Sequence, residues 1–195
     1  RMSRGLGDVY KRQLHSRDLA DCVAEARWLA GEGVKELIVV AQDPTAYGED
    51  WGKPGSICEL LDKLNKVPGL EWIRIMYAYP ERITDEFIAA MKRNDKVVPY
   101  LDLPIQHCDD AVLKAMSRRG GRKEIEDAIA RLRAAIPGIT LRTNSAHAAS
   151  AAAIVSGARR SSSAIIPASK IRIFVPAFLG KGYAAVDKFH SGRYN

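Results

Sequence analysis

The chain repeats one kind of unit: an apolar stretch that breaks into a polar cluster and continues into a segment with helical spacing. The clearest examples are VVAQDPTAYGED at 39–50, RIMYAYPERITDEF at 74–87 and YLDLPIQHCDDAVLKAM at 100–116. Loops that follow the parallel strands of a β/α barrel all open on one face of it. The repeat therefore predicts parallel β/α units that carry polar side chains to a common rim.

Apolar periodicity assigns the elements of these units. Apolar residues at spacings of three and four predict a helix over 17–31. Strands are expected at 36–41, 71–77, 97–103 and 139–143. Further helices are expected at 56–64, 84–91, 109–116 and 123–135, with Ser56 and Thr84 as N-caps. The predicted fold class is α/β, a partial (β/α) barrel with parallel strands, outer helices and irregular ends.

Length and cysteine usage restrict the class of protein. The 195 residues allow one domain with a sizeable core. No apolar run approaches the ~18–20 residues that a membrane-spanning helix needs. Cys22, Cys58 and Cys108 lie far apart and form no CxxC pair, which argues against a disulfide scaffold and fits a reducing cytoplasm. We therefore expect a cytoplasmic protein without a membrane partner and without a metal site built from these cysteines.

The two ends differ from the body of the chain. Residues 1–13 contain DVYKRQ, which resembles the translated end of a sequencing adapter, and we interpret them as an artefact or a disordered arm. Residues 144–195 are rich in Ala and Ser, although IRIFVPAFLG could form a strand interrupted by Pro176. We interpret them as a divergent or frameshifted tail, with a genuine irregular segment as the alternative. The expected domain is a partial barrel over 14–143.

The charge distribution follows the same division. The whole chain carries a net charge of +7, whereas residues 14–143 hold 19 basic and 21 acidic residues. The basic excess thus lies in the two ends. A basic chain normally suggests a nucleic-acid partner, but the body of this one does not.

The polar clusters supply the candidate binding residues. Gln42, Asp43 and Thr45 follow the first expected strand, and their polar groups can hold the head of a small ligand. Asp-Pro is equally a turn signal. Tyr77 ends the second strand, where a ring either stacks on a ligand or packs against the rim. The alternatives for these positions are a binding site and ordinary turns.

The third and fourth strands end in further candidates. Gln106 and His107 follow the third strand, and a lone His is more often structural than a ligand. Arg142 ends the fourth strand, where it either pairs with a carboxylate or is solvated. Cys108 beside His107 lacks the further spaced ligands that a metal site requires.

Taken together, three segments resemble the radical S-adenosylmethionine (SAM) methylthiotransferases. They are VKELIVVAQDPTAYG, EWIRIMYAYPERITDE and YLDLPIQHCDDAVLKAM, and the resemblance covers about 15–143. AQDPTAYG and LPIQHCD are most similar to the RimO branch, which modifies an aspartate of a small-subunit ribosomal protein. The sister branch, MiaB, acts on tRNA adenosine and is expected to read GQNVNSYG and LPVQSGS.

The resemblance implies a partial (β/α)₆ barrel that uses SAM and 4Fe-4S clusters. In the family, a CxxxCxxC loop holds a cluster that chelates SAM, and reductive cleavage of SAM gives a deoxyadenosyl radical. It implies that Gln42 and Asp43 contact SAM, that Gln106 and His107 lie near its ribose, and that Arg142 faces its carboxylate. Thr45 and Tyr77 complete the implied cofactor-binding set.

The chain also departs from the family pattern. It has no CxxxCxxC, and NSAHAAS replaces the apolar strand and GFPGE loop expected after LRT. The family's separate cluster-binding and TRAM domains are absent from this sequence. We therefore expect a fragment that is inactive as this chain, with no catalytic residue of its own. The implied partner is a small-subunit ribosomal protein, with nucleic acid contacted only through the ribosome.

Three alternatives stay open. The first is the tRNA-modifying sister branch. The second is another β/α enzyme that binds a phosphorylated metabolite, which needs a Gly-rich loop near the later strands that residues 143–195 do not supply. The third is a non-catalytic RNA- or ribosome-binding module that uses the basic ends.

Overall fold

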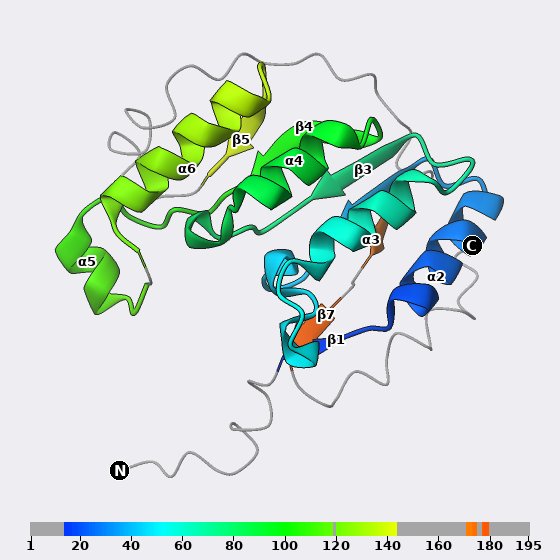
Figure 1. Cartoon of the computed structure of the whole chain (residues 1–195), viewed down its shortest axis with the longest axis horizontal. Helices are drawn as coiled ribbons and strands as arrows, with labels where there is room; N and C mark the ends of the chain where they lie inside the picture. Colours follow the sequence, from blue (N-terminus) through cyan, green and yellow to red (C-terminus); the bar gives the residue numbers. More distant parts are fainter. Residues whose placement is uncertain (1–13, 119, 144–170, 175–176, 180–195) are drawn as a thin grey trace, which may run out of the picture.

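A parallel β-sheet forms the centre of the protein (Figure 1). The computed structural model describes residues 14–118, 120–143, 171–174 and 177–179. The sheet has the order β5-β4-β3-β2-β6 and all of its neighbouring strands pair in parallel. Its strands are β2 (Glu36–Val39), β3 (Trp72–Ile75), β4 (Val97–Asp102), β5 (Thr140–Arg142) and β6 (Ile171–Phe174). This confirms the four predicted strands and the α/β class.

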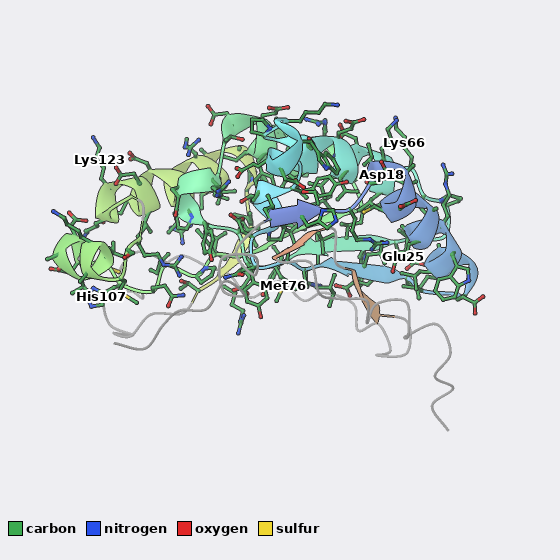
Figure 2. The ribbon with its side chains drawn as sticks, turned by 90° about the horizontal axis from the view of Figure 1, so that it is seen from below. Asp18, Glu25, Lys66, Met76, His107 and Lys123 are labelled. Atoms are coloured by element: carbon green, nitrogen blue, oxygen red, sulfur yellow. The ribbon has the colours of Figure 1, made fainter. Side chains whose placement is uncertain are left out.

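Part of the strand order is that of a β/α barrel. Strands β2 to β5 lie side by side in chain order, as in such a barrel, and β6 pairs with the free edge of β2. Helices cover one face of this sheet, and Met76 points from the opposite side (Figures 1 and 2). The covering helices are α2 (Leu19–Gly31), α3 (Ser56–Asn65), α4 (Asp85–Arg93) and α6 (Arg122–Ala135). The shorter α5 (Asp110–Ala115) lies between β4 and α6 in the chain.

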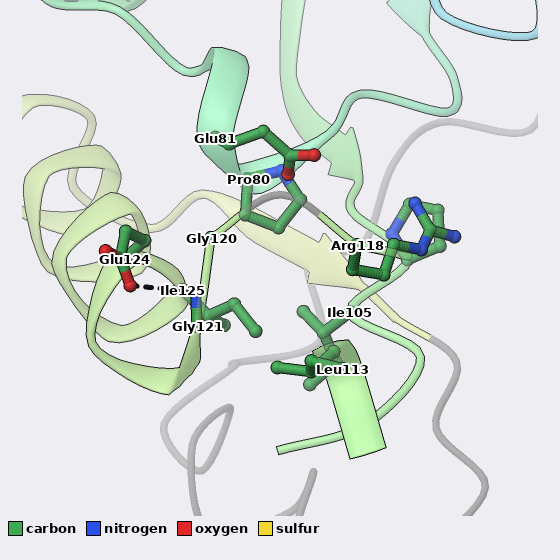
Figure 3. Close-up of a pocket in the computed structure, with 10 residues that line it drawn as sticks. Pro80, Glu81, Ile105, Leu113, Arg118, Gly120, Gly121, Glu124 and Ile125 are labelled. Atoms are coloured by element: carbon green, nitrogen blue, oxygen red, sulfur yellow. Dashed lines mark hydrogen bonds between the residues drawn. The ribbon is translucent and has the colours of Figure 1, made fainter. Parts of the chain in front are cut away.

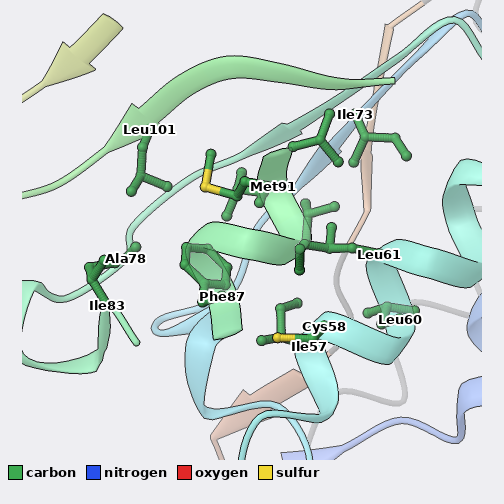
Figure 4. Packing of buried hydrophobic residues seen from close by; sticks show 14 of the residues in the cluster. Ile57, Cys58, Leu60, Leu61, Ile73, Ala78, Ile83, Phe87, Met91 and Leu101 are labelled. Atoms are coloured by element: carbon green, nitrogen blue, oxygen red, sulfur yellow. The ribbon is translucent and has the colours of Figure 1, made fainter. Parts of the chain in front are cut away.

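The core lies between the sheet and these helices. Leu37 and Val39 on β2 pair with Ile73 and Ile75 on β3, and all four side chains are fully buried. Leu101 continues this apolar row on β4. The helices contribute Leu60, Leu61, Phe87 and Met91 to the same cluster (Figure 4). Since burying one such side chain contributes about 1.5–3 kcal/mol, this face supplies most of the stability.

The two predicted N-caps have different outcomes. Thr84 caps α4, because its Oγ1 accepts a hydrogen bond from the backbone N–H of Phe87 at 3.1 Å. Ser56 is not the N-cap of α3, since Gly55 occupies that place with a φ of 85°. The Ser56 hydroxyl instead donates to the carbonyl of Lys53 at 2.7 Å. A left-handed entry into the helix is easy for glycine and strained for serine.

The first described residues are built into the fold. Strand β1 (Leu14–Ser16) pairs antiparallel with β7 (Ala177–Leu179). The Ser16 hydroxyl accepts from the N–H of Gly48, and the Ser16 N–H donates to Asp50, both at 2.9 Å. These bonds hold the start of the domain against the loop after β2.

Three short 3-10 helices were not expected from the sequence. They are η1 (Pro44–Ala46), η2 (Glu49–Trp51) and η3 (Pro80–Arg82), and they lie in the connections after β2 and β3. In the C-terminal region, the sequence suggests one strand over IRIFVPAFLG that Pro176 interrupts. The structure has two strands there, β6 and β7, on either side of residues 175–176. Residues 1–13, interpreted from the sequence as an artefact or a disordered arm, and residues 144–170, part of the expected divergent tail, lie outside the described residues, so the domain boundaries stay predictions. Within the described ranges, no helix combines the length and apolar character needed to cross a membrane.

Candidate strand-end ligand site

A cavity of about 440 Å³ opens where strands β2 to β5 end. It is lined by Ala41, Gln42, Tyr77, Tyr79, Asp102, Pro104, Gln106, Arg118 and Arg142. Four candidates from the sequence, Gln42, Tyr77, Gln106 and Arg142, therefore meet around one space. Its volume lies within the ~300–1,000 Å³ of small-molecule sites, and its walls combine amide, aromatic and charged groups.

Two lining residues have a strained backbone. Tyr77 and Gln106 adopt φ values of 64° and 61°, in the left-handed region that non-glycine residues avoid. The N–H of His107 donates to the carbonyl of Ile105 at 2.7 Å, which closes a three-residue turn around Gln106. Such strain costs about 1–3 kcal/mol per residue and concentrates at functional sites. The left-handed backbone at these two positions places the Tyr77 and Gln106 side chains in the cavity wall.

An ion pair forms another part of the wall. Arg142 Nη1 lies 2.9 Å from Asp102 Oδ2. The Asp102 side chain is only 4% exposed, whereas that of Arg142 is 60% exposed. A guanidinium has five N–H donors in a planar fork, so the bond to Asp102 leaves Arg142 with further donors.

Further polar groups occupy the sheet face away from the helices. Arg74 on β3 donates through Nε to the buried Glu36 of β2 at 2.6 Å. The same guanidinium lies 4.8 Å from the ring centroid of Tyr100 on β4. Along each strand these residues alternate with the apolar core residues, as the two-residue period of a strand requires.

Asp43 and Thr45 do not line the cavity. The Asp43 carboxylate accepts hydrogen bonds from the backbone N–H of Thr45, at 3.1 Å, and from the Thr45 hydroxyl, and so caps η1. It also lies 2.8 Å from Arg82 Nε. Burial raises the pKa of Asp43, although these hydrogen bonds and Arg82 oppose the shift. The two residues shape the loop that carries Gln42.

His107 lies at the α5 end of the molecule, outside the cavity lining (Figure 2). Its Nδ1 accepts from the N–H of Asp109 at 2.9 Å, just before α5 begins. This contact gives His107 a place in the turn that leads into α5.

Three lining residues, Tyr79, Asp102 and Arg118, were not among the candidates from the sequence. Strand alternation with Tyr100 was a signal that Asp102 faces the polar side. The guanidinium of Arg118 stacks on the Tyr79 ring, 4.8 Å from its centroid. No local pattern marks Arg118, because it reaches the cavity from the connection between α5 and α6.

The three cysteines do not belong to this site. None of them lines the cavity, and Cys58 packs among apolar side chains (Figure 4). Burial raises the pKa of Cys22 and Cys58 to about 11 and also raises the pKa of Cys108. They are therefore protonated thiols at neutral pH. Within the described residues, no group of three His, Cys, Asp or Glu side chains could hold a metal ion.

Comparison with known proteins assigns the family. A family model described as the radical SAM superfamily matches residues 7–144. The chain belongs to the radical SAM superfamily. Enzymes of this superfamily use SAM and 4Fe-4S clusters. The strand-end cavity fits a ligand with the size and polarity of SAM, but the described residues do not fit a cluster.

The individual proteins that are similar to this chain share one name. The chain is 48% identical over 129 residues to a protein of Acetivibrio thermocellus named ribosomal protein uS12 methylthiotransferase RimO. This match covers 66% of this chain and 28% of the relative. Proteins of the same name from Clostridium botulinum and Elusimicrobium minutum are also 48% identical, over 131 and 130 residues. Those matches cover 67% and 66% of this chain, and 29% and 30% of the relatives. The chain thus spans less than a third of their length.

Proposed function

We propose that this chain is part of a radical SAM methylthiotransferase that acts on an aspartate of ribosomal protein uS12. Its role in that enzyme is to bind SAM in the strand-end cavity. The observation that carries this proposal is the convergence of Gln42, Tyr77, Gln106 and Arg142 on one cavity. The name shared by the relatives favours the ribosomal-protein branch over the tRNA branch.

The lining groups match the parts of SAM. The amides of Gln42 and Gln106 both donate and accept, which suits ribose hydroxyls and the adenine edge. The Tyr77 ring is 43% exposed and offers a stacking surface for the base. Arg142 keeps donors for a carboxylate beside its bond to Asp102. When it is bound to a reduced cluster, SAM supplies the radical that removes hydrogen from an unactivated carbon.

The proposal includes that this chain alone is inactive. A radical SAM cluster needs thiolates from one loop, and Cys22, Cys58 and Cys108 lie on two helices and in a separate loop. Anaerobic reconstitution with iron and sulfide should give no charge-transfer absorbance and no deoxyadenosine after reduction. A stoichiometric cluster, or reductant-dependent deoxyadenosine, would contradict this part of the proposal.

Binding of SAM tests the cavity itself. Without a cluster to anchor the methionine group, we expect weak binding, with a Kd on the order of 1 mM in equilibrium dialysis. Tyr77→Ala and Gln106→Ala should each weaken it several-fold. Lys92→Ala, beside a groove at the other end of β4, is the matched control and should leave it unchanged. A wild-type chain without affinity for SAM, or equal losses in all three variants, would refute the assignment of the cavity.

A further inference from the structure

A charged groove adjoins the strand-end cavity. This groove, about 810 Å³, is lined by Asp43, Glu49, Tyr79, Glu81, Arg82, Met116, Ser117 and Arg118. Tyr79 and Arg118 line both spaces. Their stacked pair, 4.8 Å from guanidinium carbon to ring centroid, therefore stands at the boundary between cavity and groove.

Arg118 differs from the neighbouring arginines in its ion pairing. Arg82 forms ion pairs with Asp43 and Glu49, and Arg142 forms one with Asp102. Among the ion pairs of the described residues, none includes Arg118. Glu81 lines the same groove without pairing with it. A guanidinium aimed at two cavities without a carboxylate partner is available to an anionic ligand.

The surrounding backbone fixes the position of Arg118. Ser117 adopts a φ of 57°, and the N–H of Arg118 donates to the carbonyl of Leu113 at 2.9 Å. The start of α6 is tied by the bond from the Gly121 N–H to Glu124 at 2.8 Å, which Figure 3 shows on the opposite side of a small pocket from Arg118. A guanidinium held by a stack and by an ordered turn loses little freedom on binding, so it is pre-organised.

We infer that Arg118 recognises a carboxylate of the ligand at this boundary. The inference rests on the proposed function, because it names a further binding residue of the same site. A planar guanidinium fork matches a carboxylate with two parallel hydrogen bonds. Two carboxylates could reach it: the methionyl carboxylate of SAM from the cavity, and an aspartate side chain of a peptide substrate from the groove.

The first arm of the test isolates the SAM carboxylate. The 195-residue chain is titrated with SAM and with decarboxylated SAM, which lacks only that group. We expect the wild type to prefer SAM about tenfold, as a charged hydrogen bond allows. Because Arg142 also offers donors to this carboxylate, Arg118→Gln should reduce the preference for SAM without weakening the decarboxylated ligand, and Arg118→Lys should keep more of the preference than Arg118→Gln does. Lys114→Gln removes a charge from α5 outside the lining and serves as the control.

The second arm isolates the peptide. A blocked aspartyl peptide and its asparaginyl analogue are compared on the same variants. If the preference for the ligand that carries the carboxylate depends on Arg118 in only one of the two comparisons, that comparison identifies which carboxylate Arg118 binds. Absence of such discrimination in both arms, or an equal weakening of both members of each pair, would overturn the inference. A wild type that binds the aspartyl peptide through Arg118 but binds neither SAM ligand would refute the proposed function and leave this inference standing.

Discussion

The two faces of the sheet are built from the same strands and have opposite characters. Toward the helices, Leu37, Ile73 and Leu101 form a continuous apolar layer. Away from the helices, Glu36 and Arg74 form an ion pair, and Asp102 holds Arg142 near the strand ends. The strands present apolar side chains to the helix-covered face, whereas the open face has specific polar pairs. Alternation along a strand thus separates stability from ligand recognition within single strands.

This contrast teaches where strain and charge are tolerated. The left-handed residues Tyr77 and Gln106 lie beyond the strand ends, outside the apolar layer. A packed core excludes such features because every gap or unpaired charge there is costly. The open side accepts them because a ligand can satisfy the groups that it exposes.

The largest expected effect comes from the helix-covered face. Leu101→Ala should lower the free energy of unfolding by about 2–5 kcal/mol, because it leaves a cavity in the core. Its neighbour Tyr100, on the open face, should cost only about 1 kcal/mol when changed to alanine, chiefly through its contact with Arg74. Urea denaturation measures both. Equal losses would mean that the two faces do not differ as described.

A smaller effect is expected from the ion pair of the open face. Arg74→Met leaves the buried Glu36 carboxylate without its hydrogen-bond donor and should cost about 2 kcal/mol. The double change Glu36→Gln with Arg74→Met should recover most of that loss, because no charge is then left buried. Denaturation of the single and double variants checks this. A double variant as unstable as the single one would show that packing, not charge, holds these strands.

Relief of strain at the site should stabilise the fold. Gln106→Gly should raise the free energy of unfolding by about 1 kcal/mol, since glycine adopts a φ of 61° without penalty. The same variant should bind SAM more weakly. Thermal unfolding and equilibrium dialysis on one preparation measure the two effects. A loss of stability would show that the Gln106 side chain supports the fold instead.

The smallest expected effect is a pH dependence of the free energy of unfolding, which has opposite signs for Asp43 and Asp62. Burial raises the pKa of Asp43 above its usual 3.8, so its ionisation destabilises the fold and this cost fades as the pH falls through the raised pKa. Hydrogen bonds from Arg93 lower the pKa of Asp62, so its contribution is present above 3.8 and is lost as the pH falls below it.

The measurement is urea denaturation between about pH 3 and pH 6. As the pH rises, Asp43→Asn should gain stability relative to wild type, whereas Asp62→Asn should lose it. Slopes of the same sign would contradict the opposite environments of these carboxylates.

Local sequence patterns account for the parts of the fold and of the candidate site that could be predicted. The strands β2 to β5 and the cavity residues Gln42, Tyr77, Gln106 and Arg142 follow from buried runs that end in polar clusters. Ser56 was misassigned because the conformation of Gly55 decides the start of α3. Strand β6 pairs with β2 from more than 130 positions away in the chain, which no local period indicates.

The site shows the same limit. Asp43 and His107 satisfy nearby backbone groups, and the sequence does not tell whether such side chains point inward or cap a turn. Arg118 escaped notice because its place depends on a left-handed Ser117 and on the packing of the α5–α6 connection. Non-local geometry selects these positions, and sequence spacing does not report it.

Residue-resolved NMR of the labelled chain during a titration with SAM tests the central claim most directly. The claim is that the open strand ends form the adenosyl site. Shift changes should be confined to the backbone around Gln42, Tyr77, Gln106 and Arg142, together with the Arg118 side chain. The groove around Met91 and Pro99, at the other end of β4, should stay unchanged. Shifts centred on that groove, or no saturable shifts anywhere, would contradict the claim.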